Sequence, residues 1–77
     1  MYQVIGSDFC QYCEDAQRLL DERNLDYRYR KLNRFMSRYF KRKNLKTVPQ
    51  VWHNGEYIGG YSELAEHLFE QDTVVHP

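Results

Sequence analysis

Long apolar runs are absent from this 77-residue sequence, in which hydrophobic residues occur singly or in pairs. A membrane-spanning helix needs about 20 consecutive apolar residues, and the core of a secretory leader needs about 7–15. The sequence therefore predicts a soluble protein with no membrane contact. Repeats and low-complexity stretches are absent too. We therefore expect one compact domain over residues 1–77, holding a single site.

Cysteine is scarce, since the chain has only Cys10 and Cys13. A secreted domain that depended on disulfides would carry several cysteine pairs, so one C-x-x-C pair indicates redox chemistry or half of a metal site. A zinc site would need two more ligands at short spacing, and His53, His67 and His76 lie too far apart for that pattern. Two inert cysteines are the other alternative. The cysteine content predicts a reducing compartment.

A surplus of charge of one sign is also missing, because 11 basic residues balance 11 acidic ones. This balance argues against a protein that binds nucleic acid over its whole surface. The charges are nevertheless segregated: residues 28–46 hold nine basic residues and no acid, whereas the acids lie in 1–27 and 56–77. We interpret the basic segment as a solvated face that balances the acids, with steering of an acidic protein substrate as the alternative.

Apolar periodicity predicts strands and helices in the order β-α-β-α-β-β-α. The Asn54-Gly55 pair between the last two strands is a strong hairpin signal. The first two strands, joined through a helix, should be parallel, and the hairpin should add antiparallel strands to the same sheet. Residues 71–77 lack a period and are expected to fray. The expected strands span 2–6, 25–32, 50–53 and 56–59, and the expected helices span 12–23 and 34–43, with a third that opens within 59–63 and ends by about residue 70.

The predicted helices are amphipathic, and Asn24 and Asn44 are suited to end the first two of them. Because the aromatic residues of the second helix are spaced for the core, we do not interpret its basic residues as a nucleic-acid-binding surface. The expected apolar faces comprise, in chain order, Cys13, Ala16, Leu19 and Leu20, then Phe35, Met36, Tyr39 and Phe40, then Leu64, Ala65, Leu68 and Phe69.

Cys10 falls between a predicted strand end and a helix start, where free backbone N–H groups and the helix dipole favour a thiolate. Ser7 and Asp8 precede it and are expected to supply turn or capping oxygens. Cys13 follows one helical turn later, within reach of the Cys10 sulfur. This spacing suits reversible exchange, in which Cys10 attacks a disulfide and Cys13 resolves the mixed disulfide.

Three motifs follow one another along the chain: Cys10-Gln11-Tyr12-Cys13, then Thr47-Val48-Pro49-Gln50 before the hairpin, then Gly59-Gly60-Tyr61-Ser62-Glu63-Leu64 before the last helix. In this order and at these separations they resemble a glutaredoxin, over roughly residues 2–70. The resemblance implies a minimal thioredoxin-like α/β fold, with a mixed four-stranded sheet and three helices. It also implies an enzyme of cell redox homeostasis, a glutathione-disulfide oxidoreductase that reduces protein disulfides and glutathione mixed disulfides.

The resemblance assigns both cysteines to catalysis and eight residues in or beside the motifs to glutathione binding. Pro49 would be cis and would present the Val48 backbone to an extended tripeptide. The backbone N–H groups of Tyr61 and Ser62 would hold the γ-glutamyl carboxylate, and the alternative role of Ser62, compatible with this one, is that of a plain N-cap. Lys46 would lie near the glycyl carboxylate. The glutathione-binding set implied in this way is Tyr12, Lys46, Thr47, Val48, Pro49, Gly60, Tyr61 and Ser62.

Two positions depart from the glutaredoxin pattern. Gln11 replaces the usual proline between the cysteines, and members without that proline sometimes hold a [2Fe-2S] cluster between two subunits with glutathione as co-ligand. Ser7 stands where a lysine or arginine usually supports the thiolate, and the next residue, Asp8, disfavours a thiolate. We expect no metal in this chain and keep the iron–sulfur cluster as an alternative.

The partners implied by the resemblance are glutathione, as co-substrate, and disulfide-bearing proteins, among which ribonucleotide reductase is a customary client. We expect a small dithiol glutaredoxin of bacterial or bacteriophage type, monomeric and cytoplasmic, with no nucleic-acid or membrane partner. One rival is a glutaredoxin-like redoxin that takes electrons from thioredoxin reductase, although such proteins tend to lack the Gly-Gly-aromatic-Ser pattern present here. Another rival is a binding module that docks through its basic face and has vestigial thiols.

Overall fold

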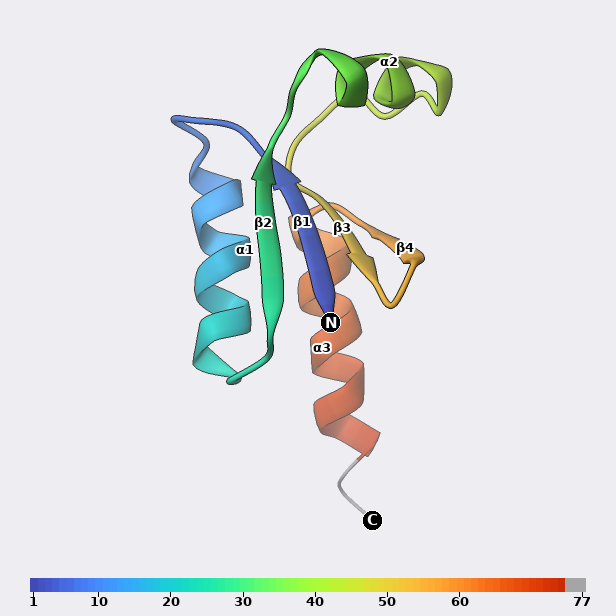
Figure 1. The fold of residues 1–77 in the computed structure, drawn as a ribbon. Coiled ribbons are helices and arrows are strands. Elements are labelled where there is room, and N and C mark those ends of the chain that lie inside the picture. Colours follow the sequence, from blue (N-terminus) through green and yellow to red (C-terminus); the bar gives the residue numbers. More distant parts are fainter. Residues whose placement is uncertain (75–77) are drawn as a thin grey trace.

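The computed structural model describes the backbone of residues 1–74 and the side chains of residues 1–70. The strands and helices follow the predicted order, with boundaries within two residues of those expected except at the last helix (Figure 1). That helix continues to Val74, into the segment where a frayed tail is expected, and residues 75–77 lie outside the described part. The elements are β1 (Tyr2–Gly6), α1 (Gln11–Glu22), β2 (Tyr27–Lys31), α2 (Arg34–Arg42), β3 (Gln50–His53), β4 (Glu56–Gly59) and α3 (Tyr61–Val74).

The four strands form one mixed sheet in the order β2-β1-β3-β4. β1 pairs with β2 in parallel, and β3 pairs antiparallel with both β1 and β4. The hairpin between β3 and β4 turns at Asn54 and Gly55, whose φ angles of 51° and 87° are the left-handed values that a two-residue turn requires. The predicted fold class, a mixed four-stranded sheet with three helices, is therefore confirmed.

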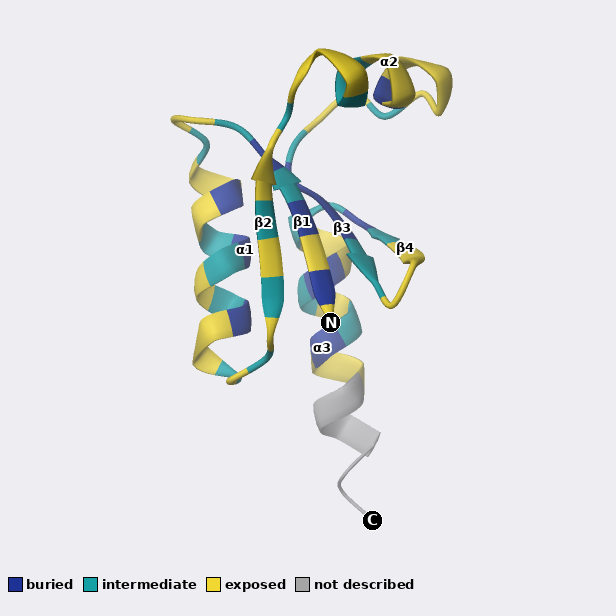
Figure 2. Cartoon of the chain, in the orientation of Figure 1, coloured by how far each residue is buried: buried dark blue, intermediate teal, exposed yellow. Residues whose placement is uncertain are grey.

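The core lies between the sheet and two of the helices, α1 and α3, which also pack against each other (Figure 1). Burial alternates at the start of β1 (Figure 2), where Tyr2 and Val4 are buried and Gln3 between them is exposed. The face predicted for α1 is confirmed, whereas Phe69 of α3 is exposed, contrary to expectation. The side chains that fill the core are Tyr2, Val4, Ala16, Leu20, Val51, Leu64 and Leu68.

The second helix, α2, lies beyond the carboxyl ends of β1 and β2, apart from the other two helices (Figure 1). Its Phe40 is 5% exposed and contacts Trp52 of β3, with ring centroids 6.4 Å apart. Phe35, in contrast, is 78% exposed, and Tyr39 is also exposed. The expectation that these aromatics all face the core is therefore wrong. Helical spacing identifies a common face, but only the turn that holds Phe40 comes close enough to the sheet to be buried.

The helix ends agree with the sequence better than the helix starts. Asn24 and Asn44 follow α1 and α2 with φ angles of 57° and 59°, the left-handed conformation expected of residues that end a helix. At the other end, α3 begins at Tyr61, so Ser62 lies inside the first turn and is not the N-cap. No helix in the described residues is both long and apolar enough to cross a membrane.

Candidate active site

Cys10 lies directly before α1 and caps it with its own sulfur. The Cys10 Sγ accepts a hydrogen bond from the backbone N–H of Cys13 at 3.3 Å. On its other side, the Cys10 thiol donates to the backbone carbonyl of Val48 at 3.8 Å. An N–H donor and the positive end of a helix dipole both stabilise negative charge on sulfur. The local geometry therefore suits a sulfur that reacts as a thiolate.

Cys13 is only 1% exposed, on the inner face of α1. Burial raises the pKa of the Cys13 thiol to about 11, and the hydrogen bond with Cys10 adds to this effect. Both cysteines are free thiols. The two sulfurs differ in access, because Cys13 is buried, and the Cys10 sulfur is the one that a disulfide can reach. Within the described residues, no group of three or more His, Cys, Asp or Glu side chains is placed to hold a metal ion.

Gly6 of β1 and Tyr29 of β2 enclose Cys13. A Cβ atom at Gly6 would lie 2.9 Å from Cys13 Sγ and 2.8 Å from Tyr29 Cε2, closer than side chains can approach. The Tyr29 hydroxyl donates a hydrogen bond to the carbonyl of Ser7 at 3.3 Å. Burial is the main cause that raises the pKa of Tyr29, and the nearby cysteines raise it further. The sequence places Tyr29 only in a half-buried strand. Its position beside Cys13 depends on the pairing of β1 with β2, which no local motif specifies.

Asp8 forms an ion pair with Lys31, with the Lys31 Nζ 2.9 Å from the Asp8 Oδ1. Because Cys10 caps α1, the expectation that Ser7 or Asp8 supplies the capping oxygen is wrong. The ion pair also places the Lys31 ammonium group beside the Asp8 carboxylate, the group that the sequence predicts to disfavour a thiolate at Cys10. Lys31 lies at the end of β2, next to Gly6 of β1 in the parallel register, so the sheet brings this cation to Asp8.

A groove of about 290 Å³ lies beside the Val48 backbone, where the start of α1, the loop before β3 and the start of α3 meet. The Val48–Pro49 peptide bond is cis, as the resemblance implies. The rings of Tyr12 and Tyr61 lie 5.7 Å apart on one side of the groove. All the residues expected to bind glutathione line this groove except Lys46. The lining is Tyr12, Thr47, Val48, Pro49, Gly60, Tyr61, Ser62 and Glu63.

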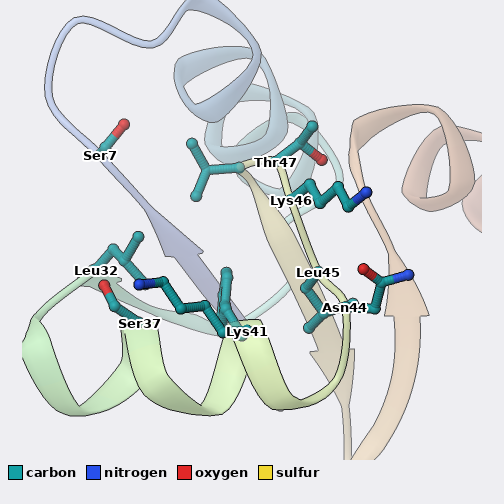
Figure 3. A pocket seen from close by; sticks show the side chains of 10 residues that line it. Ser7, Leu32, Ser37, Lys41, Asn44, Leu45, Lys46 and Thr47 are labelled. Atoms are coloured by element: carbon teal, nitrogen blue, oxygen red, sulfur yellow. The ribbon is translucent and has the colours of Figure 1, made fainter.

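Lys46 lines a different and larger pocket, of about 510 Å³, between α2 and the end of the sheet (Figure 3). Thr47 and Val48 line both the groove and this pocket, so the two are neighbours across one short stretch of backbone. Lys46 is not among the residues that line the groove, and its place near the glycyl carboxylate stays a prediction.

Gln50 fixes the loop that carries Val48, although the sequence analysis gives it no role. Its side chain is 4% exposed, and its Nε2 donates to the Thr47 carbonyl at 2.8 Å and to the Thr47 Oγ1 at 3.3 Å. Its Oε1 accepts from the Tyr57 hydroxyl of β4. A buried side-chain amide that makes three hydrogen bonds holds the loop to which it is bonded in one geometry. A polar residue at a buried strand position is the signal that could have identified it.

Glu63 is a groove residue that the sequence analysis does not assign. Its Oε1 accepts from the backbone N–H of Gly60 at 2.7 Å, which ties the turn before α3 to the first turn of the helix. Gly59 has a φ of 133°, and a Cβ atom there would lie 2.7 Å from the Glu63 Cγ. Glycine is therefore required at 59 both for the backbone angle and for the close approach. A glutamate three residues after a helix cap is the sequence signal for this contact.

The glutaredoxin family model matches residues 1–58, which include both cysteines and the cis proline. Human mitochondrial glutaredoxin-2 is 32% identical over 66 residues, covering 78% of this chain and 40% of that protein. The mouse protein is 30% identical over 66 residues, covering 78% of this chain and 42% of that protein. The chain thus spans about two fifths of the length of these relatives. Both relatives are mammalian, so they do not support the expected bacterial or bacteriophage type.

Solved structures share the fold. Glutaredoxin 1 from Francisella tularensis, complexed with cacodylate, has a TM-score of 0.79 at 22% identity, covering 94% of this chain and 95% of that one. A buckwheat glutaredoxin–glutathione complex has a TM-score of 0.80 at 23% identity, covering 95% of this chain and 72% of that one. At these identities the likeness shows the thioredoxin-like fold alone. The family follows from the sequence match over residues 1–58, by which the chain belongs to the glutaredoxin family.

Proposed function

We propose that this chain is a glutathione-dependent thiol-disulfide oxidoreductase that reduces protein disulfides and glutathione mixed disulfides through Cys10 and Cys13. One observation carries the proposal: the Cys10 sulfur accepts a helix N–H and contacts the Val48 carbonyl, and Val48 borders the 290 Å³ groove. A reactive sulfur therefore lies beside a groove that is near the lower size limit for small-ligand sites.

The groove offers partners for each part of glutathione. The Val48 backbone, at the edge of the groove, can pair strand-fashion with an extended tripeptide. The N–H groups of Tyr61 and Ser62 lie in the first turn of α3, where the helix dipole favours a carboxylate such as that of the γ-glutamyl residue. The Glu63 carboxylate lines the same end and suits the ammonium group of that residue.

The proposed chemistry uses two thiols of different access. The Cys10 thiolate attacks the glutathione sulfur of a mixed disulfide, which forms a Cys10–glutathione disulfide and releases the other thiol with a proton from solvent. A second glutathione thiolate then attacks this bond, which frees Cys10 and forms glutathione disulfide. With a protein disulfide, Cys13 loses its proton and attacks the Cys10–protein bond, which forms a Cys10–Cys13 disulfide. Two glutathione molecules reduce that disulfide and are oxidised to glutathione disulfide.

The test is turnover of a small glutathione mixed disulfide, with electrons supplied in parallel by glutathione plus glutathione reductase and by thioredoxin reductase. We expect turnover with glutathione. Turnover with thioredoxin reductase alone would contradict the proposal and support the glutaredoxin-like redoxin.

Single cysteine variants separate the two roles. Cys10→Ser should abolish all activity because the nucleophile is lost. Cys13→Ser should keep reduction of the mixed disulfide, which needs one thiol, and lose reduction of a protein disulfide, which needs a resolving thiol. Reduction of both substrates is measured by NADPH oxidation through glutathione reductase. Equal loss from the two variants on both substrates would contradict these roles.

Three finer expectations are proposals from the sequence. The protein is a small dithiol glutaredoxin of bacterial or bacteriophage type, it is a cytoplasmic monomer, and ribonucleotide reductase is among its clients. Size-exclusion chromatography with light scattering tests the monomer. Visible absorbance of freshly purified protein tests the alternative of a subunit-bridging [2Fe-2S] cluster.

A further inference from the structure

The hydroxyl of Tyr29 and the sulfur of Cys13 meet beside Gly6. The parallel pairing of β1 with β2 sets Tyr29 opposite Val4, which lies two positions before Gly6 and on the same face of β1 (Figure 1). A Cβ atom at Gly6 would collide with both the Tyr29 hydroxyl oxygen and the Cys13 Sγ. These two atoms therefore approach the same point in space, and glycine at position 6 leaves the room in which they meet.

The Tyr29 hydroxyl has two acceptors within its reach. It donates to the backbone carbonyl of Ser7 at 3.3 Å. Its second acceptor is the Cys13 sulfur: burial is the main cause that raises the pKa of Cys13, and a side-chain hydrogen bond with Tyr29 acts against burial and lowers that pKa. Burial, then the charges of Cys13 and Cys10, raise the pKa of Tyr29 itself. The hydroxyl therefore keeps its proton at neutral pH and acts as a donor.

The neighbours of Cys13 act on its charge in opposite directions. Burial raises the pKa of Cys13 most, and Cys10 raises it further through a hydrogen bond and through its own charge. A backbone hydrogen bond from Ser7 and the side chain of Tyr29 lower that pKa. Once Cys10 is bound to a substrate sulfur, it carries neither a proton nor a charge. Burial is then the main obstacle to a thiolate at Cys13, and the two donors are the groups that offset it.

The charged groups around this pair come from the loop before α1 and from the end of β2. The Asp8 carboxylate raises the pKa of Tyr29, after burial and the two cysteines. Asp8 is itself paired with Lys31, whose Nζ lies 2.9 Å from the Asp8 Oδ1. This ion pair keeps the carboxylate charge partly neutralised, so the hydrogen bond from Tyr29 is the side-chain contact that favours a thiolate at Cys13.

We propose that Tyr29 is a catalytic residue of the resolving step: its hydroxyl turns from the Ser7 carbonyl to the Cys13 sulfur and donates to it while that sulfur is a thiolate. Cys13 releases its proton to solvent and attacks the Cys10 sulfur of a Cys10–substrate disulfide. The Cys10–Cys13 bond forms and the Cys10–substrate bond breaks, so the cysteine pair is oxidised and the substrate is reduced. The substrate sulfur leaves as a thiolate and takes a proton from solvent. The inference rests on the proposed function, because it assigns a residue to the second thiol of that reaction.

The first test measures the resolving step by itself. The reduced protein is loaded with glutathione on Cys10 at acidic pH, by use of the pyridyl disulfide of glutathione. The pH is then raised, and mass spectrometry of acid-quenched samples follows the release of glutathione by Cys13. Tyr29→Phe removes the hydroxyl and keeps the ring. Loss of a hydrogen bond to a charged sulfur should reduce the thiolate fraction about tenfold. A more basic thiolate is a better nucleophile, so the release at neutral pH should be about threefold slower.

The pH profile distinguishes this role from a contribution to packing. As the pH rises toward the pKa of Cys13, the thiolate forms without help from Tyr29, so the difference in rate should shrink. A variant with disturbed packing would instead stay slow at every pH. A second readout is NMR titration of the labelled cysteine Cβ carbon in Cys10→Ala, which has one cysteine. The pKa of Cys13 should be higher in Cys10→Ala with Tyr29→Phe than in Cys10→Ala alone.

Tyr27→Phe is the matched control. Tyr27 lies two positions before Tyr29 on the same face of β2, and its hydroxyl donates to the Asp21 carboxylate at 3.3 Å. The variant therefore removes the same group from the same strand, away from the cysteines. It should keep the wild-type rate of glutathione release and the wild-type pKa of Cys13. Circular dichroism and thermal unfolding check that both variants are folded.

The outcomes separate this inference from the proposed function. If the wild type does not turn over a small mixed disulfide with glutathione, the proposed function fails, and the NMR titration still tests the contact of Tyr29 with Cys13, since it needs no turnover. If the wild type turns over that substrate but folded Tyr29→Phe releases glutathione as fast as Tyr27→Phe, the proposed function stands and the inference is overturned. A pKa of Cys13 that Tyr29→Phe leaves unchanged, or release that is slow at every pH, would also overturn it.

Discussion

Cys10 and Cys13 are three positions apart, yet the fold places them in different surroundings. Cys10 is held between a helix N–H and the Val48 carbonyl at the surface. Cys13 lies under the helix against Gly6 and Tyr29. Burial is the main reason why the pKa of Cys13 is raised to about 11, because the thiolate would lose its hydration there. The difference between two identical side chains thus comes from one turn of helix.

This difference predicts selective alkylation. In the reduced protein at neutral pH, iodoacetamide should modify Cys10 and leave Cys13 unmodified, because Cys13 is buried and protonated. Modification of Cys13 should become appreciable only as the pH approaches about 11. Peptide mapping by mass spectrometry measures the modified fraction of each cysteine.

The control for selective alkylation is the unfolded protein, in which both cysteines should react. Cys13→Ser should be alkylated at the same rate as the wild type at neutral pH. Rapid modification of Cys13 in the folded protein at neutral pH would contradict the structural assignment.

Among the elements, the loop before β3 is the one that most directly shapes the candidate site. Its geometry depends on Gln50, which binds Thr47 and accepts from Tyr57 on the neighbouring strand. Because Thr47 precedes Val48, the Gln50 amide fixes the backbone that borders both the groove and the pocket. Gln50 acts through these contacts and is therefore a positioning residue.

Replacing Gln50 tests this role. Gln50→Leu removes the hydrogen bonds to Thr47 while keeping a buried side chain of similar size, and should lower the free energy of unfolding by about 1–3 kcal/mol. Because the loop is loosened and the cysteines are untouched, the KM for a glutathione mixed disulfide should rise more than kcat falls. Denaturant unfolding and steady-state kinetics measure these two effects.

Tyr57→Phe is the matched control for Gln50→Leu. It removes the hydrogen bond from the Tyr57 hydroxyl but leaves both contacts between Gln50 and Thr47, so its KM should stay close to that of the wild type. An unchanged KM in a folded Gln50→Leu variant would show that the loop keeps its shape without the amide.

For the molecule as a whole, β1, β3 and α3 meet at a cluster of rings far from the cysteines. Tyr2 stacks on His53 with ring centroids 4.1 Å apart, and His67 of α3 lies edge-on, 5.8 Å from His53. Burial lowers the pKa of His53 below its ordinary value of 6.5; the N-terminus and His67 add to this effect, and Glu56 opposes it. His53 therefore takes up a proton more readily in the unfolded chain than in the folded one.

The sign of the pH dependence follows from this shift. As the pH falls through 6.5, the unfolded chain is protonated first, so the free energy of unfolding should decrease until the pH passes the lower folded pKa of His53. His53→Phe keeps a ring against Tyr2 and removes the titrating group. Thermal unfolding at pH 8 and pH 5 should therefore show a smaller loss of Tm in His53→Phe than in the wild type. An equal loss in both proteins would assign the pH dependence to other groups.

Local signals in the sequence predict the order of elements, the helix ends and the hairpin, because they depend on neighbouring residues. Asn24 and Asn44 end helices in the left-handed conformation, and Asn54-Gly55 forms the expected turn. Local signals do not predict burial, because the burial of a side chain depends on which other element packs against it. Phe35 has the spacing of a core residue, but it is 78% exposed, on a helix that lies beyond the ends of β1 and β2 (Figure 1).

The sequence by itself determined the C-x-x-C pair at a helix start and the glycine turn, because each is a contiguous motif with its own backbone geometry, whereas the cis proline was implied by the family resemblance. Only the tertiary structure decided which remote residues meet there. Strand pairing brings Tyr29 to Cys13, and burial in the sheet turns Gln50 toward Thr47. Such contacts depend on how strands and helices that are far apart in the sequence pack together, and no local sequence motif specifies that packing.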